Sequence, residues 1–411
     1  MGNLFKIAIR NLIRYKRRTI LTGSLVAIGI IFVLVFVAAS GSFKNLMIGE
    51  ITDSMIGHIQ VHQKGYVASI DNLPLNMNLK PQAVAKVEQA LKSIPEVEAV
   101  SPRVKFGGMF SNFMETTNIR LNGVDPEKEI ATVPLLMGRV SDGDKAIKKG
   151  EILIPDLLAK GMKVKVGDMI VVIATNKDGS VNGKQLKVGG VLDSATGPGG
   201  RDGYVHIDDA VEILRMDERE VSEIAIRLKD FSKMKMVYQK LEVALGQEMN
   251  KQGKSMFEVH TWEQLSPFYN IARMIDVMTF FIKLMLIAIV LVSIMNVMIM
   301  AVYERIREIG TIGAIGTLPG KILSLFVIEG FSLGVFGVFI GNIVGLGIVF
   351  IMNLVKIRFQ FGRGLITLAP AVQLSDIITV SFIVIVVAVL GSLQPAFKAS
   401  RMEPIEALRH V

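Results

Sequence analysis

Four long runs of apolar residues divide the chain. Residues 19–43 and 284–303 contain no charged side chain, and two further apolar runs cover residues 330–355 and 377–397. A helix needs about 20 apolar residues to cross the roughly 30 Å hydrocarbon core of a bilayer. The pattern therefore predicts a membrane protein with four transmembrane α-helices.

Between the first and second runs, residues 44–270 have the alternating and helical periodicities of a water-soluble domain. The pattern predicts strands at residues 57–66, 96–104, 117–124 and 221–228, and helices at residues 81–94 and 231–247. Strands and helices are mixed along the segment, so we expect an α+β domain of two subdomains on the side of the membrane opposite the N-terminus.

A β-hairpin is expected at residues 172–188 of this domain. Asp178-Gly179 and Asn182-Gly183 are both strong turn signals between its two short strands. The tip is polar, so we expect it to project into water rather than to pack into a core. The tip residues are Lys177, Asp178, Gly179, Ser180, Asn182 and Gly183. A passive surface hairpin and a partner-binding hairpin both fit this pattern.

The N-terminal segment is basic and amphipathic. Lys6, Arg10, Arg14 and Arg17 fall at helical spacing, and no acidic residue precedes Glu50. Such a helix suits an anionic inner leaflet, which favours an uncleaved anchor over a signal peptide. Four spans place both termini on one side, and the basic N-terminus predicts that this side is the cytoplasm.

Composition agrees with a membrane protein. The chain is 51% hydrophobic with a net charge of +9, and much of the basic charge flanks the apolar runs, so it indicates membrane topology rather than nucleic-acid binding. The chain has no cysteine, which excludes disulfides, Cys-ligated metal sites and thiol catalysis.

A short charged segment separates the second and third spans. Glu304, Arg305, Arg307 and Glu308 fall within about one helical turn and would form a compact charged patch on a short surface helix. Gly310, Gly313 and Gly316 follow in the same segment. An ordinary juxtamembrane loop and a docking element for a soluble partner are both compatible with this composition.

The third span carries a stripe of small residues. Gly330, Gly334, Gly337, Gly341 and Gly345 recur at helical spacing, which predicts close helix packing, either within one subunit or in a dimer interface. Glu329 precedes the stripe and is expected near the membrane boundary. An acid at this depth is a functional candidate by default, and reaching toward water or pairing with Lys321 fits the pattern equally well.

No catalytic or metal-binding motif emerges from the chain. The nearest approach to a phosphate-binding Walker A loop is GTLPGKI, which starts at Gly316, is one residue short and ends in Ile where Ser or Thr is required. We therefore expect neither enzymatic activity nor a bound cofactor, and His58 and His62 suggest two surface histidines rather than a metal site.

Three motifs resemble the FtsX/MacB-like permeases of ABC transporters: AIRNLIRYKRRTIL near the N-terminus, VYERIREIGTIGAIG with VIEGFSLG between the second and third spans, and QPAFKASRMEPIEALR at the end. Length and layout are most similar to the lipoprotein-releasing LolC/LolE type. The resemblance implies a MacB-type periplasmic domain with porter and sabre parts, a dimer with a second permease copy or a homologous permease, and location in the bacterial inner membrane.

The resemblance also implies function. A separate ABC ATPase in two copies, which binds ATP and Mg²⁺, would act on the segment from Glu304 to Gly316. Mechanotransmission to the outer domain would then drive extraction or export of a lipophilic substrate, with lipoproteins the first choice. In this reading the hairpin tip at residues 177–183 would recruit a periplasmic lipoprotein carrier or adaptor. MacB-like efflux of peptides or drugs and FtsX-like regulation of a cell-wall hydrolase are the alternatives.

The expected organisation in chain order is a cytoplasmic amphipathic helix at 1–18, the first span at 19–43, the outer domain at 44–270, a stalk and second span at 271–303, a coupling loop at 304–321, the third span at 322–355, an outer loop at 356–376, the fourth span at 377–397 and a cytoplasmic tail at 398–411.

Overall fold

The computed structural model describes residues 2–195, 199–249, 253, 255–361 and 364–403. The predicted tail at 398–411 therefore lies largely outside the described residues. The chain divides into two compact units. The helical unit comprises residues 1–45, 273–359 and 367–411, and the strand-rich unit comprises residues 46–272 and 360–366.

Six helices account for most of the helical unit, and α2 and α9 continue into the strand-rich unit. They are α1 (Gly2–Arg14), α2 (Lys16–Ile51), α9 (Phe268–Glu304), α10 (Ile306–Ala314), α11 (Pro319–Val355) and α12 (Leu374–Ser400). Among the described residues, α2, α9, α11 and α12 are long and apolar enough to cross a membrane. The expected four-helix membrane architecture is thus confirmed.

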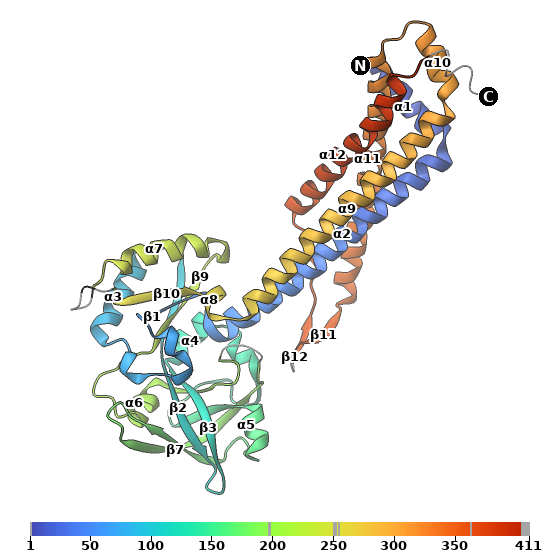
Figure 1. Cartoon of the computed structure of the whole chain (residues 1–411). Helices are drawn as coiled ribbons and strands as arrows, with labels where there is room; N and C mark the ends of the chain where they lie inside the picture. Colours follow the sequence, from blue (N-terminus) through green and yellow to red (C-terminus); the bar gives the residue numbers. More distant parts are fainter. Residues whose placement is uncertain (1, 196–198, 250–252, 254, 362–363, 404–411) are drawn as a thin grey trace. The chain divides into compact units, whose positions relative to one another are not determined.

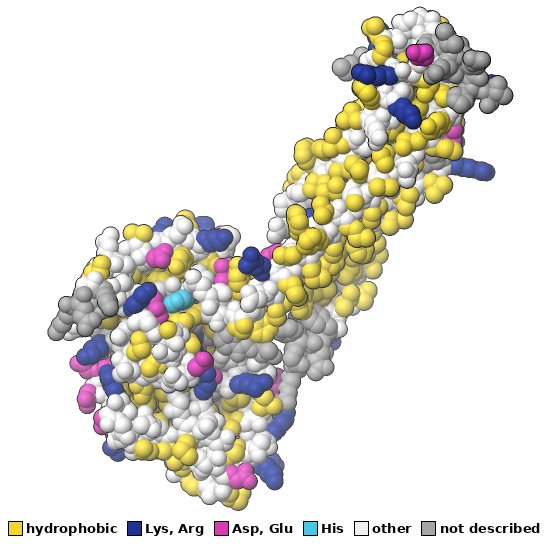
Figure 2. Space-filling model, viewed as in Figure 1, with side chains coloured by type: hydrophobic (Ala, Val, Ile, Leu, Met, Phe, Trp, Pro, Cys, Tyr) yellow, Lys and Arg dark blue, Asp and Glu magenta, His cyan; other side chains and the backbone are white. Residues whose placement is uncertain are grey.

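The four long helices extend beyond the spans expected from the sequence. Helix α9 has 37 residues, which gives about 55 Å at 1.5 Å per residue and exceeds the hydrocarbon thickness. Their packed core includes Val26 and Ile30 of α2, Ile294 of α9 and Phe326 of α11. Hydrophobic side chains also cover their exposed surface (Figure 2), as lipid-facing helices require.

Among its described residues, the strand-rich unit contains one sheet of ten strands and six complete α-helices. The strands are β1 (Ile59–Gln63), β2 (Val97–Ser111), β3 (Thr116–Val124), β4 (Val140–Gly143), β5 (Glu151–Pro155), β6 (Met169–Thr175), β7 (Val181–Leu192), β8 (Gly203–His206), β9 (Glu223–Leu228) and β10 (Phe257–Thr261). The helices are α3 (Pro81–Lys92), α4 (Pro126–Thr132), α5 (Asp156–Gly161), α6 (Ile207–Ile213), α7 (Met234–Gly246) and α8 (Trp262–Leu265).

Short helical turns complete the fold. They are the π-helical η1 (Thr52–Ile56) and the 3₁₀ turns η2 (Val67–Asn72), η3 (Leu75–Met77), η4 (Leu136–Arg139) and η5 (Phe231–Lys233). A separate two-stranded sheet is formed by β11 (Arg358–Phe361) and β12 (Gly364–Thr367).

Strand β2 joins two parts of the sheet. Its first half pairs with β9, which continues to β1 and β10. Its second half pairs with β3 on one side and β6 on the other. The pairings β2–β3–β8–β5–β7–β6–β2 close into a ring of six strands (Figure 1). This arrangement confirms the expected α+β class.

The periodicity of the sequence explains these elements. In β6, Ile170, Val172 and Ala174 are buried while the residues between them are partly exposed, which is the two-residue period of a strand with one covered face. In α3, Val87 and Leu91 form the buried stripe, four residues apart. Strand β2 continues to Ser111, beyond the expected end near residue 104, because its second half gains two partners.

Candidate functional site

The chain turns sharply between α9 and α10. Arg305 lies between the two helices with non-helical backbone angles (φ −113°, ψ 18°). Helix α10 therefore starts as a separate element, at the same end of the helical unit as α1 and the end of α12 (Figure 1). This is the segment that the sequence identified as a coupling loop.

Arg305 is buried and links α10 to α11. Its guanidinium lies 3.3 Å from the Glu329 carboxylate of α11 and 2.9 Å from the Glu308 carboxylate of α10. It also stacks over the ring of Phe326, at 5.5 Å from the ring centroid. Glu329 is fully buried. The expectation that Glu329 reaches water or pairs with Lys321 is therefore wrong, because a buried carboxylate needs a cation in contact and Arg305 provides one.

The four charged residues of the expected patch do not share one environment. Glu304, Arg307 and Glu308 are exposed, whereas Arg305 has an exposed fraction of only 5%. Glu308 also lies 3.8 Å from Arg14 of α1, so the basic N-terminal helix meets the acidic face of α10. Arg305 cannot be part of an exposed patch because its charge is satisfied inside the bundle.

An apolar ridge continues from the exposed face of α10. Ile312, Ile315 and Leu318 are 38%, 81% and 64% exposed. Gly316 ends the helix with φ +93°, and the amides of Gly316 and Thr317 bond back to the carbonyls of residues 313 and 312. This is a Schellman motif, which requires a left-handed residue at this position and so favours glycine. This ridge was not predicted from the sequence, although its apolar residues flank Gly316.

The glycine stripe of α11 faces helices of the same chain. A Cβ atom added to Gly330 or Gly334 would lie 2.5 and 2.6 Å from side-chain atoms of α12. At Gly337, Gly341 and Gly345 the nearest side-chain atoms belong to α2, at 2.5, 2.8 and 3.2 Å. Close packing of α11 between α2 and α12 therefore uses all five glycines within one subunit, and Gly310 is buried on α10.

The β6–β7 hairpin has a different turn from the one expected. Asn182 and Gly183 lie inside β7, opposite Ala174 and Ile173 of β6. The turn is formed by residues 176–180 and uses only the Asp178-Gly179 signal. The second turn signal is overridden because residues 181–183 continue the ladder with β6.

The tip of this hairpin does not project freely. The Lys177 ammonium lies 3.0 Å from both carboxylate oxygens of Glu220, and the Asn182 side chain donates to the carbonyls of Glu212 and Ile213 at 3.0 and 3.1 Å. Residues 177–179 of the tip are exposed, so the expectation that the polar tip lies in water rather than in a core is confirmed. What the sequence did not predict is that Lys177 and Asn182 are also held by groups of α6 and the following loop.

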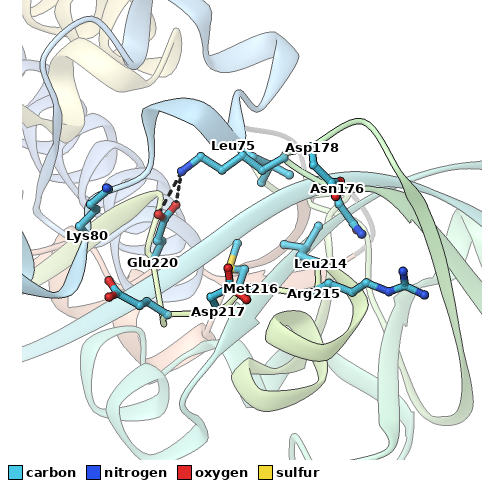
Figure 3. Close-up of a pocket in the computed structure, with 11 residues that line it drawn as sticks. Leu75, Lys80, Asn176, Asp178, Leu214, Arg215, Met216, Asp217 and Glu220 are labelled. Carbon is cyan, nitrogen blue, oxygen red and sulfur yellow. Dashed lines mark hydrogen bonds and ion pairs between the residues drawn. The ribbon is translucent and has the colours of Figure 1, made fainter.

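A cavity of about 460 Å³ lies beside the anchored tip. Lys177 and Glu220 both belong to its lining, and dashed lines in Figure 3 mark the contact between them. Its lining carries both signs of charge, from Lys80, Lys177 and Arg215 on one hand and Asp178, Asp217, Glu218 and Glu220 on the other.

A second charge cluster is buried where β2 changes partners. Arg103 of β2 lies 2.9 Å from Glu129 of α4 and 3.0 Å from Glu223 of β9, and Lys105 lies 3.3 Å from Glu223. Burial opposes ionisation of Glu223, but Lys105, His62 and Arg103 outweigh it and hold the pKa of Glu223 well below its usual range. The cluster joins the two parts of the sheet, and no sequence motif identified it. His62 is fully buried beside Glu223 and His58 is only 4% exposed, so the expectation of two surface histidines is wrong.

Family comparisons assign both units. The MacB-like periplasmic core domain matches residues 19–244, and the FtsX-like permease C-terminal domain matches residues 280–404. The chain therefore belongs to the FtsX/MacB-like permeases, close to the LolC/LolE type. It is an ABC transporter permease of the inner membrane.

Individual relatives are distant. The probable export ATP-binding/permease protein MacB of Pseudomonas entomophila is 23% identical over 98% of this chain, which spans only 58% of that relative. The lipoprotein-releasing system transmembrane protein LolC of Xylella fastidiosa is 24% identical over 71% of this chain and 72% of its own length. The solved periplasmic region of MacB from Actinobacillus actinomycetemcomitans aligns with 54% of this chain and 94% of its own, at 13% identity and a TM-score of 0.36.

Proposed function

We propose that this chain is the membrane subunit of a mechanotransmission-type ABC transporter and that a separate ATPase docks on α10. The observation that carries the proposal is the Arg305–Glu329 pair, which ties α10 to α11 while leaving the opposite face of α10 exposed. A force applied to α10 would therefore reach the long helices directly. The ATPase would supply ATP and Mg²⁺ chemistry, in two copies for a permease dimer.

The docking surface combines charge and apolar contact. The charges of Glu304, Arg307 and Glu308 would speed association with the ATPase and fix the position in which it docks, since charge complementarity acts mainly on association rate and specificity. Ile315 and Leu318 would enter an apolar groove and carry most of the affinity, because buried hot spots at an interface centre dominate binding energy.

Docking is tested by copurification of the ATPase with the full chain. Ile315→Ser with Leu318→Ser should abolish copurification, and Glu304→Lys with Glu308→Lys should weaken it. Glu242→Lys is a matched control, since it reverses an exposed charge on α7 in the strand-rich unit. Equal ATPase recovery from the ridge variant and the control would refute docking on α10.

We place α10 and both termini in the cytoplasm, because basic residues of the N-terminal helix follow the positive-inside rule. Because the chain has no cysteine, a single introduced cysteine is the only thiol in the chain that a labelling reagent can modify. Cysteine at Val243, an exposed position of α7, should react with an impermeant maleimide in intact cells. Cysteine at Ile315 should react only after lysis, and the reverse pattern would overturn this orientation.

The substrate we favour is a lipophilic one, first of all a lipoprotein, taken up on the outer side. The LolC relative is named for lipoprotein release, and the MacB relative for export, so efflux is the second candidate. Regulation of a cell-wall hydrolase is the third. An acylated lipoprotein should copurify with the chain in nanodiscs, and its non-acylated cysteine-to-serine form should not. Equal recovery of the two forms would refute acyl recognition.

A further inference from the structure

Helix α2 departs from α-helical geometry where it enters the strand-rich unit. Its last residues, 46–51, belong to that unit and continue directly into the π-helical turn η1. The amide of Gly57 bonds to the Thr52 carbonyl five positions back, at 3.0 Å. The hydroxyls of Thr52 and Ser54 bond to backbone carbonyls four positions back. Single π-turns are frequent at functional sites, and such hydroxyl bonds often bend helices. The end of α2 is therefore a local bend rather than a plain helix terminus.

The side chain of Asp53 ties this turn to one part of the sheet. Its carboxylate lies 2.5 Å from the guanidinium of Arg227 on β9 and 3.3 Å from Nε2 of His58. Arg227 in turn lies 3.0 Å from Glu98 of β2. Nδ1 of His58 accepts from the amide of Leu228 at 3.0 Å, so the neutral ring carries its proton on Nε2 and donates it to Asp53. The carboxylate is thus held by a cation of β9 and by a ring that is itself bonded to β9.

The backbone of the same turn is tied to the other part of the sheet. The carbonyl of Asp53 accepts from the amide of Leu135, directly before η4, at 2.8 Å. The carbonyl of Ser54 accepts from the guanidinium of Arg139 in η4 at 3.5 Å. Arg139 is buried and also donates to the carbonyl of Gly200, shortly before β8, at 2.8 Å. A cation beside the last carbonyls of a helix is favourable. Arg139 therefore links the end of α2 to the ring of six strands.

Helix α9 enters the strand-rich unit in a different way. Ser266, between α8 and α9, has extended backbone angles (φ −116°, ψ 126°), and Pro267 follows it. The first turn of α9 packs by apolar contact, with the ring of Tyr269 6.2 Å from that of Trp262. Residues at the ends of elements are where hinges absorb changes of backbone angle. By contrast, α2 passes into η1 through Ile51, whose backbone is helical (φ −77°, ψ −49°).

We propose that η1 is the joint through which displacement of α2 moves the two parts of the sheet relative to each other, with Asp53 and Arg139 as its positioning residues. The proposal rests on the proposed function, in which force applied to α10 reaches the long helices. Because Asp53 holds β9 and Arg139 holds the ring, a tilt of α2 pulls on both parts at once. Strand β2 belongs to both parts and has different partners in its two halves, so the sheet flexes there. The extended residue before α9 absorbs the motion of that helix instead.

A static anchor would not need these polar contacts. Met47, Ile51 and Met55 already bury the end of α2 in the core of the strand-rich unit. Apolar burial attaches a helix but has no preferred direction. Charged hydrogen bonds are directional and therefore fix which groups move together. The contacts of Asp53 and Arg139 thus add direction to an attachment that the apolar side chains already provide.

The first experiment measures the two parts of the sheet without the ATPase. Spin labels are attached to cysteines introduced at Leu157 of α5 and Val243 of α7, which are 41% and 66% exposed. Helix α5 packs against β5 of the ring, and α7 packs against β10 of the other part. Double electron–electron resonance on the full chain in nanodiscs then gives the distribution of distances between the labels.

The variant Asp53→Asn with Arg139→Met should broaden this distribution, because the joint no longer fixes the two parts. Asp53→Asn alone keeps the buried arginine and should also broaden it, so the test survives if the double variant does not fold. The matched control is Asp217→Asn with Arg215→Met, the same changes at exposed positions, and it should leave the distribution unchanged. A distribution in Asp53→Asn equal to that of the wild type would overturn the proposal.

The second experiment adds the ATPase that copurifies with the chain. In the wild type, trapping with ATP and vanadate should shift the distance between the same two labels. In Asp53→Asn this shift should be lost while ATP hydrolysis stays at the wild-type rate, which a merely structural role would not produce. No shift in the wild type, an equal shift in the variant, or a parallel loss of hydrolysis would overturn the proposal. A wild type that recruits no ATPase contradicts the proposed function instead, and the first experiment still decides whether η1 fixes the two parts.

Discussion

Removing the guanidinium of Arg305 should destabilise the helical unit far more than removing a neighbouring one. Arg305→Met keeps an unbranched side chain of similar reach but leaves the fully buried Glu329 without its cation at 3.3 Å. Breaking a buried ion pair by deleting one partner costs about 3–5 kcal/mol, because a buried charge loses its compensation. We expect a loss of this size in the free energy of unfolding.

The converse substitution, at Glu329, should lower the free energy of unfolding by a smaller amount. Glu329→Gln still accepts a hydrogen bond, and Arg305 retains Glu308 at 2.9 Å. A loss of about 1.5–3 kcal/mol is expected, the range for a hydrogen bond to a charged group. In the double variant no buried carboxylate remains unpaired, so its loss should stay well below the sum of the two single losses.

Unfolding of the full chain in bicelles by titration with dodecyl sulfate measures these free energies. Arg307→Met is the matched control, since it makes the same change two residues away at an exposed position and should alter stability by no more than about 0.5 kcal/mol. The argument fails if Arg305→Met costs no more than the control, or if the double variant equals the sum of the single variants.

Three further predictions concern packing, helix termination and pH. Gly341→Leu should lower the free energy of unfolding by at least about 1–3 kcal/mol, because its Cβ would lie 2.8 Å from Ile30. Gly347→Leu, with open space around the added side chain, should cause no such loss. The same bicelle titration compares the two variants. Gly316→Ala should lower stability by about 1 kcal/mol, since φ +93° is strained for alanine, and no loss would refute the Schellman assignment. Because the pKa of Glu223 is lower in the folded state, its ionised carboxylate stabilises the fold at pH values above the ordinary carboxyl pKa, and this stabilisation is lost as the pH falls toward the lowered pKa. Glu223→Gln should therefore make the stability of the strand-rich unit depend less on pH in acid, and the signal of the single tryptophan measures this unfolding.

The sequence predicted the long helices because span length and charge placement are local properties. It did not predict the burial of Arg305, whose partner Glu329 lies 24 positions away on another helix. Burial of a charge is decided by the tertiary partner, and four charged residues within a turn give no sign of which one faces the bundle. The apolar ridge at Ile315 was missed for the same reason, since exposure depends on what packs nearby.

The glycine stripe shows a similar limit. Its spacing predicted close packing of α11, but the partner helices were left open because the apolar faces of a neighbouring helix and of a second subunit are chemically alike. Only the structure shows that Gly334 faces α12 and Gly341 faces α2. The five glycines of the stripe in α11 are therefore occupied by contacts within one chain.

The two hairpins of the strand-rich unit show why polarity alone is a poor guide to a docking element. The β6–β7 tip is rich in polar residues, and Lys177 and Asn182 are held by an acidic side chain and carbonyl groups of the same unit. A polar group bonded within its own unit must lose that bond before it contacts a partner, so its net contribution to binding is small. An apolar side chain held in water by a rigid turn gains free energy as soon as a pocket covers it. The β2–β3 tip differs from the β6–β7 tip in this respect, since its exposed side chains are those of Phe113 and Met114.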